Sequence, residues 1–251
     1  MRGIVVCVNY SDLLKITLPR NARHLSEVLV VTHPDDEATQ AVVKTVANAA
    51  VFATDAFYRH GAHFNKGLAM EEGFEVLGRR GWTLIHDADV ILPDDLRLDI
   101  GLRPGYLYGM RRRLLHDPGL WRPELDWSKC PISADRVIAG YFQLFDASHP
   151  CMQKQPWYDV TFAHAGGCDG YFQSRWGYDK KVWLPTYCLH LGERDQNWWG
   201  RATWSLDGQP PAVNQAAMNR YLASKGWHGK RGPKVDEHVE VPGHTPTGYV
   251  P

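Results

Sequence analysis

Trp82-Thr83-Leu84-Ile85-His86-Asp87-Ala88-Asp89 is the stretch that decides the fold of this chain. Its apolar beginning predicts a buried strand over residues 83–86, with a pair of carboxylates directly after it. Carboxylates at the end of a buried strand are costly to desolvate unless a positive charge meets them. Spaced i and i+2, the two acids can turn toward one point, which suits Mg²⁺ or Mn²⁺. A solvated turn would give the same pattern, so the neighbouring elements must decide.

The composition is typical of an ordinary globular protein. Of the 251 residues, 44% are hydrophobic and 22% are charged, which is enough to bury a sizeable core. Lys plus Arg number 28 and Asp plus Glu number 28, so the formal net charge is zero. We therefore expect no overall field that draws the chain to nucleic acid or to an anionic membrane, while a local basic patch stays compatible with this balance.

Cysteine use and the N-terminus predict a cytoplasmic location. The five cysteines are an odd number and form no C-x-x-C pair, which is typical of reduced thiols. The apolar run at residues 4–8 is too short for a secretory signal, and no stretch approaches the roughly 20 apolar residues of a spanning helix. We therefore expect no membrane among the partners.

Strands alternate with helices over residues 3–90. The patterns predict strands at 3–8, 27–32, 51–54 and 83–86, and helices at 13–22, 38–49 and 66–77, the first of them interrupted by Pro19. This alternation predicts an α/β fold with a parallel sheet. Ligands of such sheets bind beyond the carboxyl ends of the strands. Polar clusters fall at several of those ends, namely residues 9–12, Asp35-Asp36, and Asp87 with Asp89.

After residue 93 the pattern changes, and aromatic residues, glycine and proline become dense. Strands are predicted at 105–109, 140–145 and 184–190, with a short helix at 169–173. From Gly226 onward the chain is rich in Gly, Pro and His, which predicts a wrapping loop, a lid or disorder.

Taken in this order, the motifs resemble a GT-A-type glycosyltransferase. The matching stretches are the first strand with Asn9-Tyr10, Asn65-Lys66-Gly67 at a helix start, residues 84–89, Gly166-Gly167-Cys168-Asp169, and Leu189-His190-Leu191-Gly192. The resemblance implies a Rossmann-type, mostly parallel sheet flanked by helices, in a single catalytic domain over residues 1–225. Its nucleotide-sugar-binding half is about residues 1–95, its mixed acceptor half is residues 96–225, and residues 226–251 form a tail or lid.

The same resemblance implies a metal and a donor site. Asp89 corresponds to the metal-ligating second acid of the Asp-x-Asp motif, and Asp87 to the first acid, which contacts the ribose and the metal shell. His190 corresponds to the histidine that some members add as a metal ligand, although a packed or surface histidine is the simpler interpretation. Asn65 and Lys66 correspond to residues that touch the nucleotide, and a solvated lysine is the alternative for Lys66. The implied cofactors are Mn²⁺ or Mg²⁺ and a nucleotide-sugar, with a UDP-sugar favoured.

Further residues fall where the family holds the nucleotide. Asn9, Tyr10 and Asp12 lie at the place of the nucleobase, and Asp36 lies where an acid contacts the base or ribose. Arg194 begins a segment, with Asn197, Trp198, Trp199 and Arg201, that is expected to close over the diphosphate. A packed surface loop would explain that segment equally well.

Asp169 is the candidate catalytic base. An inverting transferase, the favoured mechanism, needs one carboxylate that removes the proton of the acceptor hydroxyl. The two glycines before Asp169 would let an acceptor approach the backbone closely. A helix N-cap is the structural alternative, and both roles are compatible. His164 is the rival base, and a retaining enzyme would need neither.

The resemblance implies a hydroxyl acceptor, either of a glycan or of a hydroxymethylated base in DNA, as in viral DNA modification. Reaching such a base would require flipping it out of the duplex. Arg111-Arg112-Arg113, placed beyond a strand, is expected on a solvated face, with a phosphate backbone as the functional alternative.

Two other classes of function stay open. A metal-dependent nucleotidyltransferase would use a similar sheet and metal, but typically carries a Gly-rich basic loop after the first strand, which residues 9–12 do not provide. A non-catalytic carbohydrate-binding protein would explain the aromatic residues without the acids.

Overall fold

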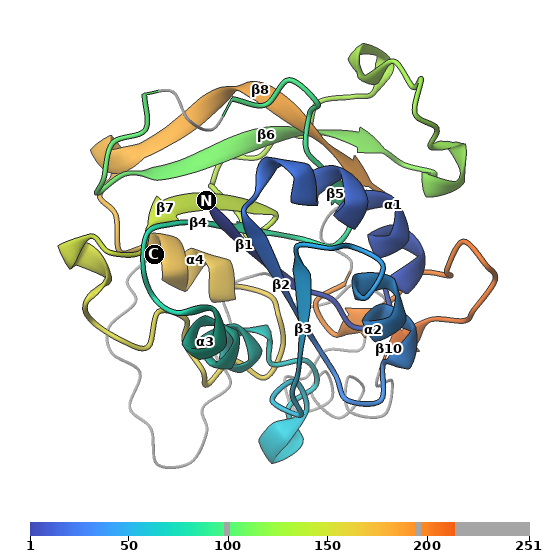
Figure 1. Ribbon diagram of the computed structural model, residues 1–251, viewed down its shortest axis with the longest axis horizontal. Helices are drawn as coiled ribbons and strands as arrows, with labels where there is room; N and C mark the ends of the chain where they lie inside the picture. The colour runs from blue at the N-terminus through green and yellow to red at the C-terminus, as the bar shows by residue number, and fades with distance from the viewer. Residues whose placement is uncertain (98–100, 194–196, 214–251) are drawn as a thin grey trace, which may run out of the picture.

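The computed structural model describes residues 1–97, 101–193 and 197–213, which form an α/β fold around one large curved sheet (Figure 1). The helices are α1 (Ser11–Asn21), α2 (Glu37–Val43), α3 (Lys66–Leu77) and α4 (Cys168–Gln173). The strands are β1 (Arg2–Val6), β2 (Glu27–Thr32), β3 (Ala49–Ala53), β4 (Trp82–His86), β5 (Val90–Ile91), β6 (Leu107–Leu115), β7 (Phe142–Asp146), β8 (Lys181–Leu191), β9 (Gly200–Arg201) and β10 (Ala212–Val213). Short 3₁₀ turns occupy Ala22–His24, Arg59–Gly61, Pro118–Leu120, Trp127–Lys129, Pro150–Met152 and Tyr178–Lys180.

The main sheet has eight strands in the order β3-β2-β1-β4-β7-β6-β8-β5. The first four run parallel to one another, and the chain passes through α1, α2 and α3 between them. β7 is antiparallel to both β4 and β6, whereas β8 is parallel to β6 and antiparallel to β5. The predicted α/β class, with a mostly parallel sheet flanked by helices, is therefore confirmed. β9 and β10 form a separate antiparallel pair.

Helices cover both faces of the sheet because successive strand residues point to opposite sides. In β1, Ile4 belongs to the buried cluster that contains Phe74 of α3 and Phe172 of α4, whereas Val5 belongs to the cluster that contains Leu14 of α1. Figure 1 accordingly shows α3 and α4 on one side of β1 and β2, and α1 and α2 on the other. This arrangement leaves the carboxyl ends of β1 and β4 open for a site.

The helices near the N-terminus differ in extent from the prediction. α1 continues through Pro19 to Asn21 rather than being interrupted, because Pro19 lies in the last turn, where its missing N–H costs only one hydrogen bond. The helix expected over residues 38–49 ends at Val43. Ala49 instead begins β3, where it pairs with Val28 of β2. In contrast, β2 and α3 have the predicted bounds.

The basic triplet was expected beyond a strand and lies inside one. Arg111, Arg112 and Arg113 are all part of β6, which runs well past the predicted end at residue 109. Arg111 is exposed, Arg112 is buried and Arg113 is half-buried, so the alternation of a strand separates their side chains. The expectation of one solvated basic face is therefore wrong for Arg112.

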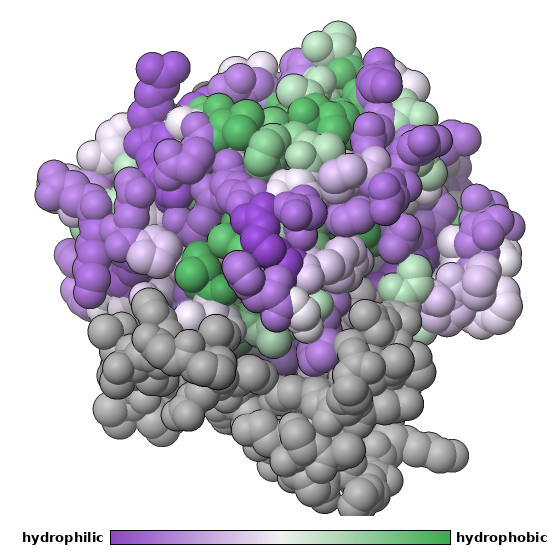
Figure 2. Space-filling view, turned by 90° about the horizontal axis from the view of Figure 1, so that it is seen from below, coloured by the Kyte–Doolittle hydropathy of each residue, from purple (hydrophilic) through white to green (hydrophobic). Residues whose placement is uncertain are grey.

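The surface seen in Figure 2 is mostly hydrophilic, with small apolar patches between polar side chains. In the part of the chain that the structure describes, no helix has both the length and the apolar character needed to cross a membrane. All five cysteines lie in that part, and each is a free thiol. The predicted domain boundary at residue 225 and the tail at 226–251 lie outside the described residues.

Candidate active site

A cavity of about 440 Å³ lies beyond the carboxyl ends of β1, β4 and β8. The beginnings of α3 and α4 and residues 134–141 form further walls. Six of the residues singled out from the sequence line it, namely Tyr10, Lys66, Asp87, Asp89, Asp169 and His190. They come from positions between 10 and 190 of the chain, and the sheet topology brings them together at the edge where parallel sheets bind ligands.

Lys66 connects two of the acids. Asn65 caps α3 by accepting a hydrogen bond from Leu68 N at 2.9 Å, which makes Lys66 the first helical residue and points it into the cavity. The Nζ of Lys66 lies 2.9 Å from Oδ1 of Asp87 and 3.8 Å from Oδ1 of Asp169. Burial disfavours the charged lysine, but the carboxylates of Asp169 and Asp87 outweigh it, so the pKa of Lys66 is raised. The lysine is therefore an ammonium ion shared by two acids.

The surroundings of Asp87 and Asp169 shift their pKa values in opposite directions. Desolvation would raise the pKa of Asp87, but the adjacent Lys66 more than offsets it, so this pKa is lowered. For Asp169 desolvation prevails over the more distant Lys66, and the negative charge of Asp87 adds to it, so this pKa is raised. Perturbed carboxyl groups in a cavity are typical of acid–base sites.

Asp89 and His190 meet where β5 pairs with β8. His190 lies opposite Val90 in this pairing, and its Nε2 is 3.7 Å from Oδ2 of Asp89. Burial, reinforced by Asp87 and opposed by His190, raises the pKa of Asp89. The Oδ1 of Asp89 is buried and has no hydrogen-bond partner among residues 1–97, 101–193 and 197–213. A buried carboxylate oxygen without a donor is suited to a cation.

The hydrogen bonds of His190 fix which ring nitrogen faces Asp89. Its Nδ1 lies 3.1 Å from the carbonyl oxygen of Gly192, which can only accept, so the proton of a neutral His190 is on Nδ1. The lone pair is then on Nε2, the atom beside Asp89.

Asp169 lies in the first turn of α4 and packs against Gly140. Gly167, at the N-cap, has a φ of 88°, which favours glycine, and turns the chain into the helix. The N–H of Gly140 donates to the carboxylate of Asp169. A Cβ at position 140 would lie 2.2 Å from Oδ1 of Asp169, so only glycine lets the carboxylate occupy this place.

Four other residues predicted from the sequence lie outside the lining of the cavity and have structural partners, namely Asn9, Asp12, Asp36 and Asn65. Asn65 caps α3 and also donates to the carbonyl of Val160 at 2.8 Å. Asp36 caps α2 and accepts from the N–H of Asn9 at 2.7 Å. Asp12 forms an ion pair with Arg201. Arg194 lies outside the described residues.

One buried ion pair at the cavity was not expected from the sequence. Arg112 donates from Nε and Nη2 to the two oxygens of Asp135, both at 3.0 Å, and its guanidinium lies 4.2 Å from the centre of the Tyr141 ring. All three residues line the cavity. The burial of β6 does not follow a simple period of two, so the strand pattern alone would not have identified Arg112 as an inward residue.

Residues 197–213, here called the strap, cross the open side of the cavity, where Asn197, Trp198 and Gly200 line it. The ring of Trp199 lies 4.6 Å from that of His164 and 5.0 Å from that of His63. The carbonyl of Trp198 accepts from the N–H of Ala165 at 2.8 Å, in the loop that leads to Asp169. His164, the rival base, is buried outside the cavity lining, where its Nδ1 accepts from Gly166 N at 3.1 Å.

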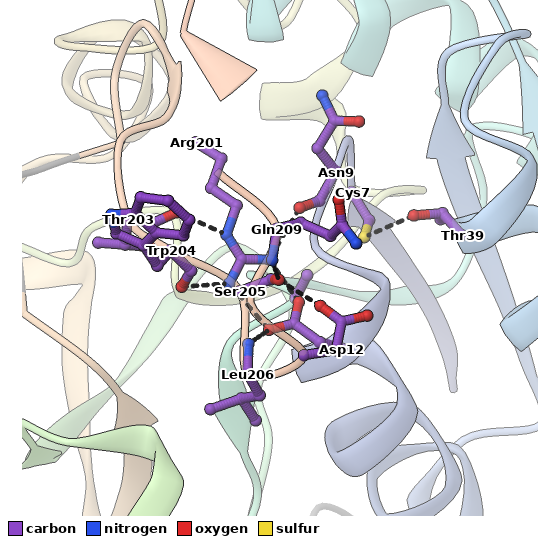
Figure 3. Close-up of polar contacts among 12 residues, drawn as sticks. Cys7, Asn9, Asp12, Thr39, Arg201, Thr203, Trp204, Ser205, Leu206 and Gln209 are labelled. Atoms are coloured by element: carbon purple, nitrogen blue, oxygen red, sulfur yellow. Dashed lines mark hydrogen bonds and ion pairs between the residues drawn. The ribbon is translucent and has the colours of Figure 1, made fainter. Parts of the chain in front are cut away.

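The other end of the strap is tied to the loop after β1. Figure 3 shows the guanidinium of Arg201 between Asp12 and the turn that begins at Thr203. The strap therefore links the loop of the candidate base to the loop after β1.

Within the described ranges, no group of three or more His, Cys, Asp or Glu side chains is gathered so as to hold a metal ion. A cation in this cavity would need ligands from a substrate or from water in addition to the protein.

No protein-family model matches this chain, and no curated protein matches it. Among solved structures, the catalytic domain of Drosophila β1,4-galactosyltransferase 7 in complex with xylobiose is 16% identical, with 88% of this chain and 79% of that chain covered and a TM-score of 0.47. Mannosyl-3-phosphoglycerate synthase from Rubrobacter xylanophilus is 18% identical, with 92% and 76% covered and a TM-score of 0.46. A 4-diphosphocytidyl-2C-methyl-D-erythritol synthase from Anaerococcus prevotii DSM 20548 is 14% identical, with 88% and 95% covered and a TM-score of 0.43. All three are remote in sequence, so we argue the function from the residues of the cavity.

Proposed function

We propose that this protein is a metal-dependent glycosyltransferase that moves a sugar from a nucleoside-diphosphate sugar, a UDP-sugar in the first place, to a hydroxyl acceptor. The observation that carries the proposal is the presence of three carboxylates, Asp87, Asp89 and Asp169, with one lysine in a single cavity at the carboxyl edge of the sheet. One ammonium group balances only part of this negative charge. A divalent cation that arrives with a diphosphate would balance the rest.

The donor set fits Mn²⁺ or Mg²⁺. Asp87 and Asp89 supply hard carboxylate oxygens, the unpartnered Oδ1 of Asp89 among them, and His190 lies beside Asp89 as a further ligand. Such ions are commonly held by one or two protein carboxylates together with substrate phosphates. When bound, the ion supplies positive charge for the diphosphate leaving group.

Asp169 acts as the general base of an inverting reaction. It removes the proton of the acceptor hydroxyl while that oxygen forms a bond to the anomeric carbon of the donor. The bond from the anomeric carbon to the diphosphate breaks, and its electron pair leaves with the diphosphate oxygen. The ammonium group of Lys66 lies where it can offset part of the charge that develops.

The acceptor is a hydroxyl of a glycan or of a hydroxymethylated base in DNA. The outer wall of the cavity contains the exposed side chains of Arg136 and Val137, and the strap adds Trp198. An aromatic ring with an apolar and a basic neighbour suits either a sugar ring or an extruded base.

A donor screen tests the proposal. The protein is incubated with Mn²⁺ and a panel of nucleotide-sugars, with and without glycan acceptors and hydroxymethylated DNA, and free nucleoside diphosphate is measured. We expect release from at least one donor, abolished in Asp87→Asn and Asp89→Asn and retained in the control Asp146→Asn, whose carboxylate bonds Ser148 N away from the cavity.

Three other outcomes would contradict the proposal. No release from any donor would exclude the transfer reaction. Sugar binding that survives Asp87→Asn and Asp89→Asn, without turnover, would indicate a carbohydrate-binding protein. Release of pyrophosphate from a nucleoside triphosphate would indicate a nucleotidyltransferase.

A further inference from the structure

Arg201 is the most fully bonded charged side chain of the strap. It is only 3% exposed, and its guanidinium pairs with both oxygens of Asp12, including an Nη2–Oδ2 contact of 2.8 Å. Its Nη1 also donates to the carbonyl of Asn9 at 2.8 Å. Nε and Nη2 donate to the carbonyls of Thr203 and Trp204, each at 3.1 Å, which closes the strap around the guanidinium (Figure 3).

Asn9 is held from two sides in an unusual backbone conformation. Its φ of 63° lies in the left-handed region. Its N–H donates to Oδ2 of Asp36 at 2.7 Å, and its carbonyl accepts from Arg201. Both backbone groups are thus fixed, while the side chain of Asn9 stays exposed.

The next residue, Tyr10, is fixed by the same guanidinium. Arg201 lies 4.7 Å from the centre of the Tyr10 ring, within the range of a cation–π contact. Tyr10 lines the cavity, and its hydroxyl has no hydrogen-bond partner in the part of the chain that the structure describes. One arginine therefore fixes both the backbone of Asn9 and the ring of Tyr10, of which Tyr10 lines the cavity.

Both carboxylate oxygens of Asp12 already have partners within the protein. Besides Arg201, its Oδ2 accepts from the N–H of Leu206 at 2.7 Å. Its role is therefore to anchor the strap. This assignment differs from the nucleobase contact that the sequence suggested for Asp12.

We propose that Arg201 is a positioning residue that fastens the strap to the loop after β1 and thereby holds the ring of Tyr10, which lines the cavity, in place for a bound nucleoside diphosphate. This inference rests on the proposed function, since it names a residue that shapes the same cavity for its donor. Without Arg201, Asp12 would be left as a buried carboxylate without its counter-ion, and Asn9 would lose one of the two bonds that hold its left-handed conformation. Apparent affinity is the intrinsic affinity multiplied by the fraction of time that such a loop spends in its binding conformation.

The test uses Arg201→Ala with Arg79→Ala as the matched control. Arg79 is a half-buried arginine, paired with Glu71 at 2.8 Å and stacked 4.5 Å from the Trp157 ring, and it does not line the cavity. Binding of UDP with Mn²⁺ is measured by calorimetry, and backbone deuterium exchange is measured over residues 9–12 and 197–213. Arg201→Lys keeps the positive charge but lacks the planar guanidinium group. It replaces Arg201→Ala in these measurements if the alanine variant does not fold.

For Arg201→Ala we expect the Kd for UDP to rise about tenfold or more. Exchange should increase at residues 9–12 as well as in the strap, and added guanidinium ion should restore both. Arg79→Ala should change neither, and Arg201→Lys should show the same defects more weakly.

Unchanged affinity and unchanged exchange at residues 9–12 in the Arg201 variants would overturn the inference alone. A wild-type protein that binds no nucleoside diphosphate would overturn the proposed function and the positioning role of Arg201 together. Loss of binding in Asp89→Asn with unchanged exchange would separate the metal site from the strap.

Discussion

At the residue scale, the ammonium group of Lys66 lies closer to Asp87 than to Asp169, and the two carboxyl groups differ accordingly. Lys66 makes its closest contact with Asp87, at 2.9 Å, and leaves Asp169 at 3.8 Å. The pKa of Asp87 is consequently lowered, and that of Asp169 is raised by its desolvation. The acid kept ionised is thus available to a cation, while the acid of raised pKa is the better proton acceptor.

Replacement of the candidate base should remove turnover without removing the donor site. For Asp169→Asn we expect kcat to fall by about 10²–10⁴, the usual contribution of a general base. The Kd for UDP with Mn²⁺ should stay close to that of the wild type, because Asp87 and Asp89 are unchanged. Steady-state kinetics and calorimetry measure the two quantities. An Asp169→Asn protein with wild-type kcat would show that the base lies elsewhere or is not needed.

Gly140 gives a second test of the same carboxylate. In Gly140→Ala the new Cβ would meet the three carboxyl atoms of Asp169 at 2.2–2.6 Å, so the side chain must move. We expect a loss of kcat of about 10²-fold, the effect of misplacing a catalytic group by about 1 Å, with little change in the affinity for UDP. Equal kcat for Gly140→Ala and wild type would contradict the position assigned to Asp169.

At the scale of elements, α3 carries Lys66 to the cavity because the helix lies unusually close to the sheet. A Cβ at Gly73 would be 2.6 Å from Cγ2 of Val31 and 2.9 Å from Cδ1 of Ile4. We expect Gly73→Ala to lower the free energy of unfolding by about 1–3 kcal/mol through overpacking, although alanine favours a helix. Urea denaturation measures this change.

Val76, on the same helix and 55% exposed, provides the control. Val76→Ala should change the free energy of unfolding by at most about 0.5 kcal/mol. If Gly73→Ala proved as stable as Val76→Ala, the close packing of α3 on β1 and β2 would be refuted.

Elements with local signals at both ends could be predicted from the sequence, and others could not. α3 is bounded by the capping Asn65 and by Gly78, whose φ is 82°, and its predicted bounds are confirmed. The predicted strand ends at residue 109, before the end of β6, because three consecutive arginines resemble a solvated run. The burial of Arg112 depends on Asp135, which comes from a distant loop. The short strand β5 was missed because only its pairing with β8 defines it.

The candidate site likewise contains residues that local sequence patterns predict and residues that they do not. The acids at the end of β4 were found because strand and motif are adjacent in the chain. The ion pair of Asp12 with Arg201 joins residues 189 positions apart, so no local sequence pattern predicts it. The strap and the contact of Asp169 with Gly140 likewise depend on tertiary structure.

At the scale of the whole molecule, buried neutral histidine makes stability depend on pH. Burial, with His63 nearby, lowers the pKa of His164 from 6.5 to about 4. The unfolded chain then binds more protons than the folded one between these values, so stability falls as the pH drops from 6.5 to 4. At about 1.4 kcal/mol per pKa unit, the loss from His164 is roughly 3 kcal/mol.

Thermal unfolding at several pH values checks this effect. His164→Asn should flatten the decline of Tm between pH 6.5 and 4, because asparagine does not titrate and can still accept from Gly166 N. His60→Asn, at an exposed position, is the control and should keep the wild-type slope. An unchanged slope in His164→Asn would show that the buried ring does not govern acid stability.

The central claim is that Asp87 and Asp89 bind a divalent cation together with the diphosphate of a nucleotide. Electron paramagnetic resonance of free Mn²⁺ tests it most directly, with titrations of protein alone, UDP alone and both together. We predict that wild-type protein with UDP removes far more free Mn²⁺ signal than either component alone, and that Asp89→Asn with UDP removes no more than UDP alone. Equal loss of signal in wild type and Asp89→Asn, or no loss beyond that caused by UDP, would contradict the account.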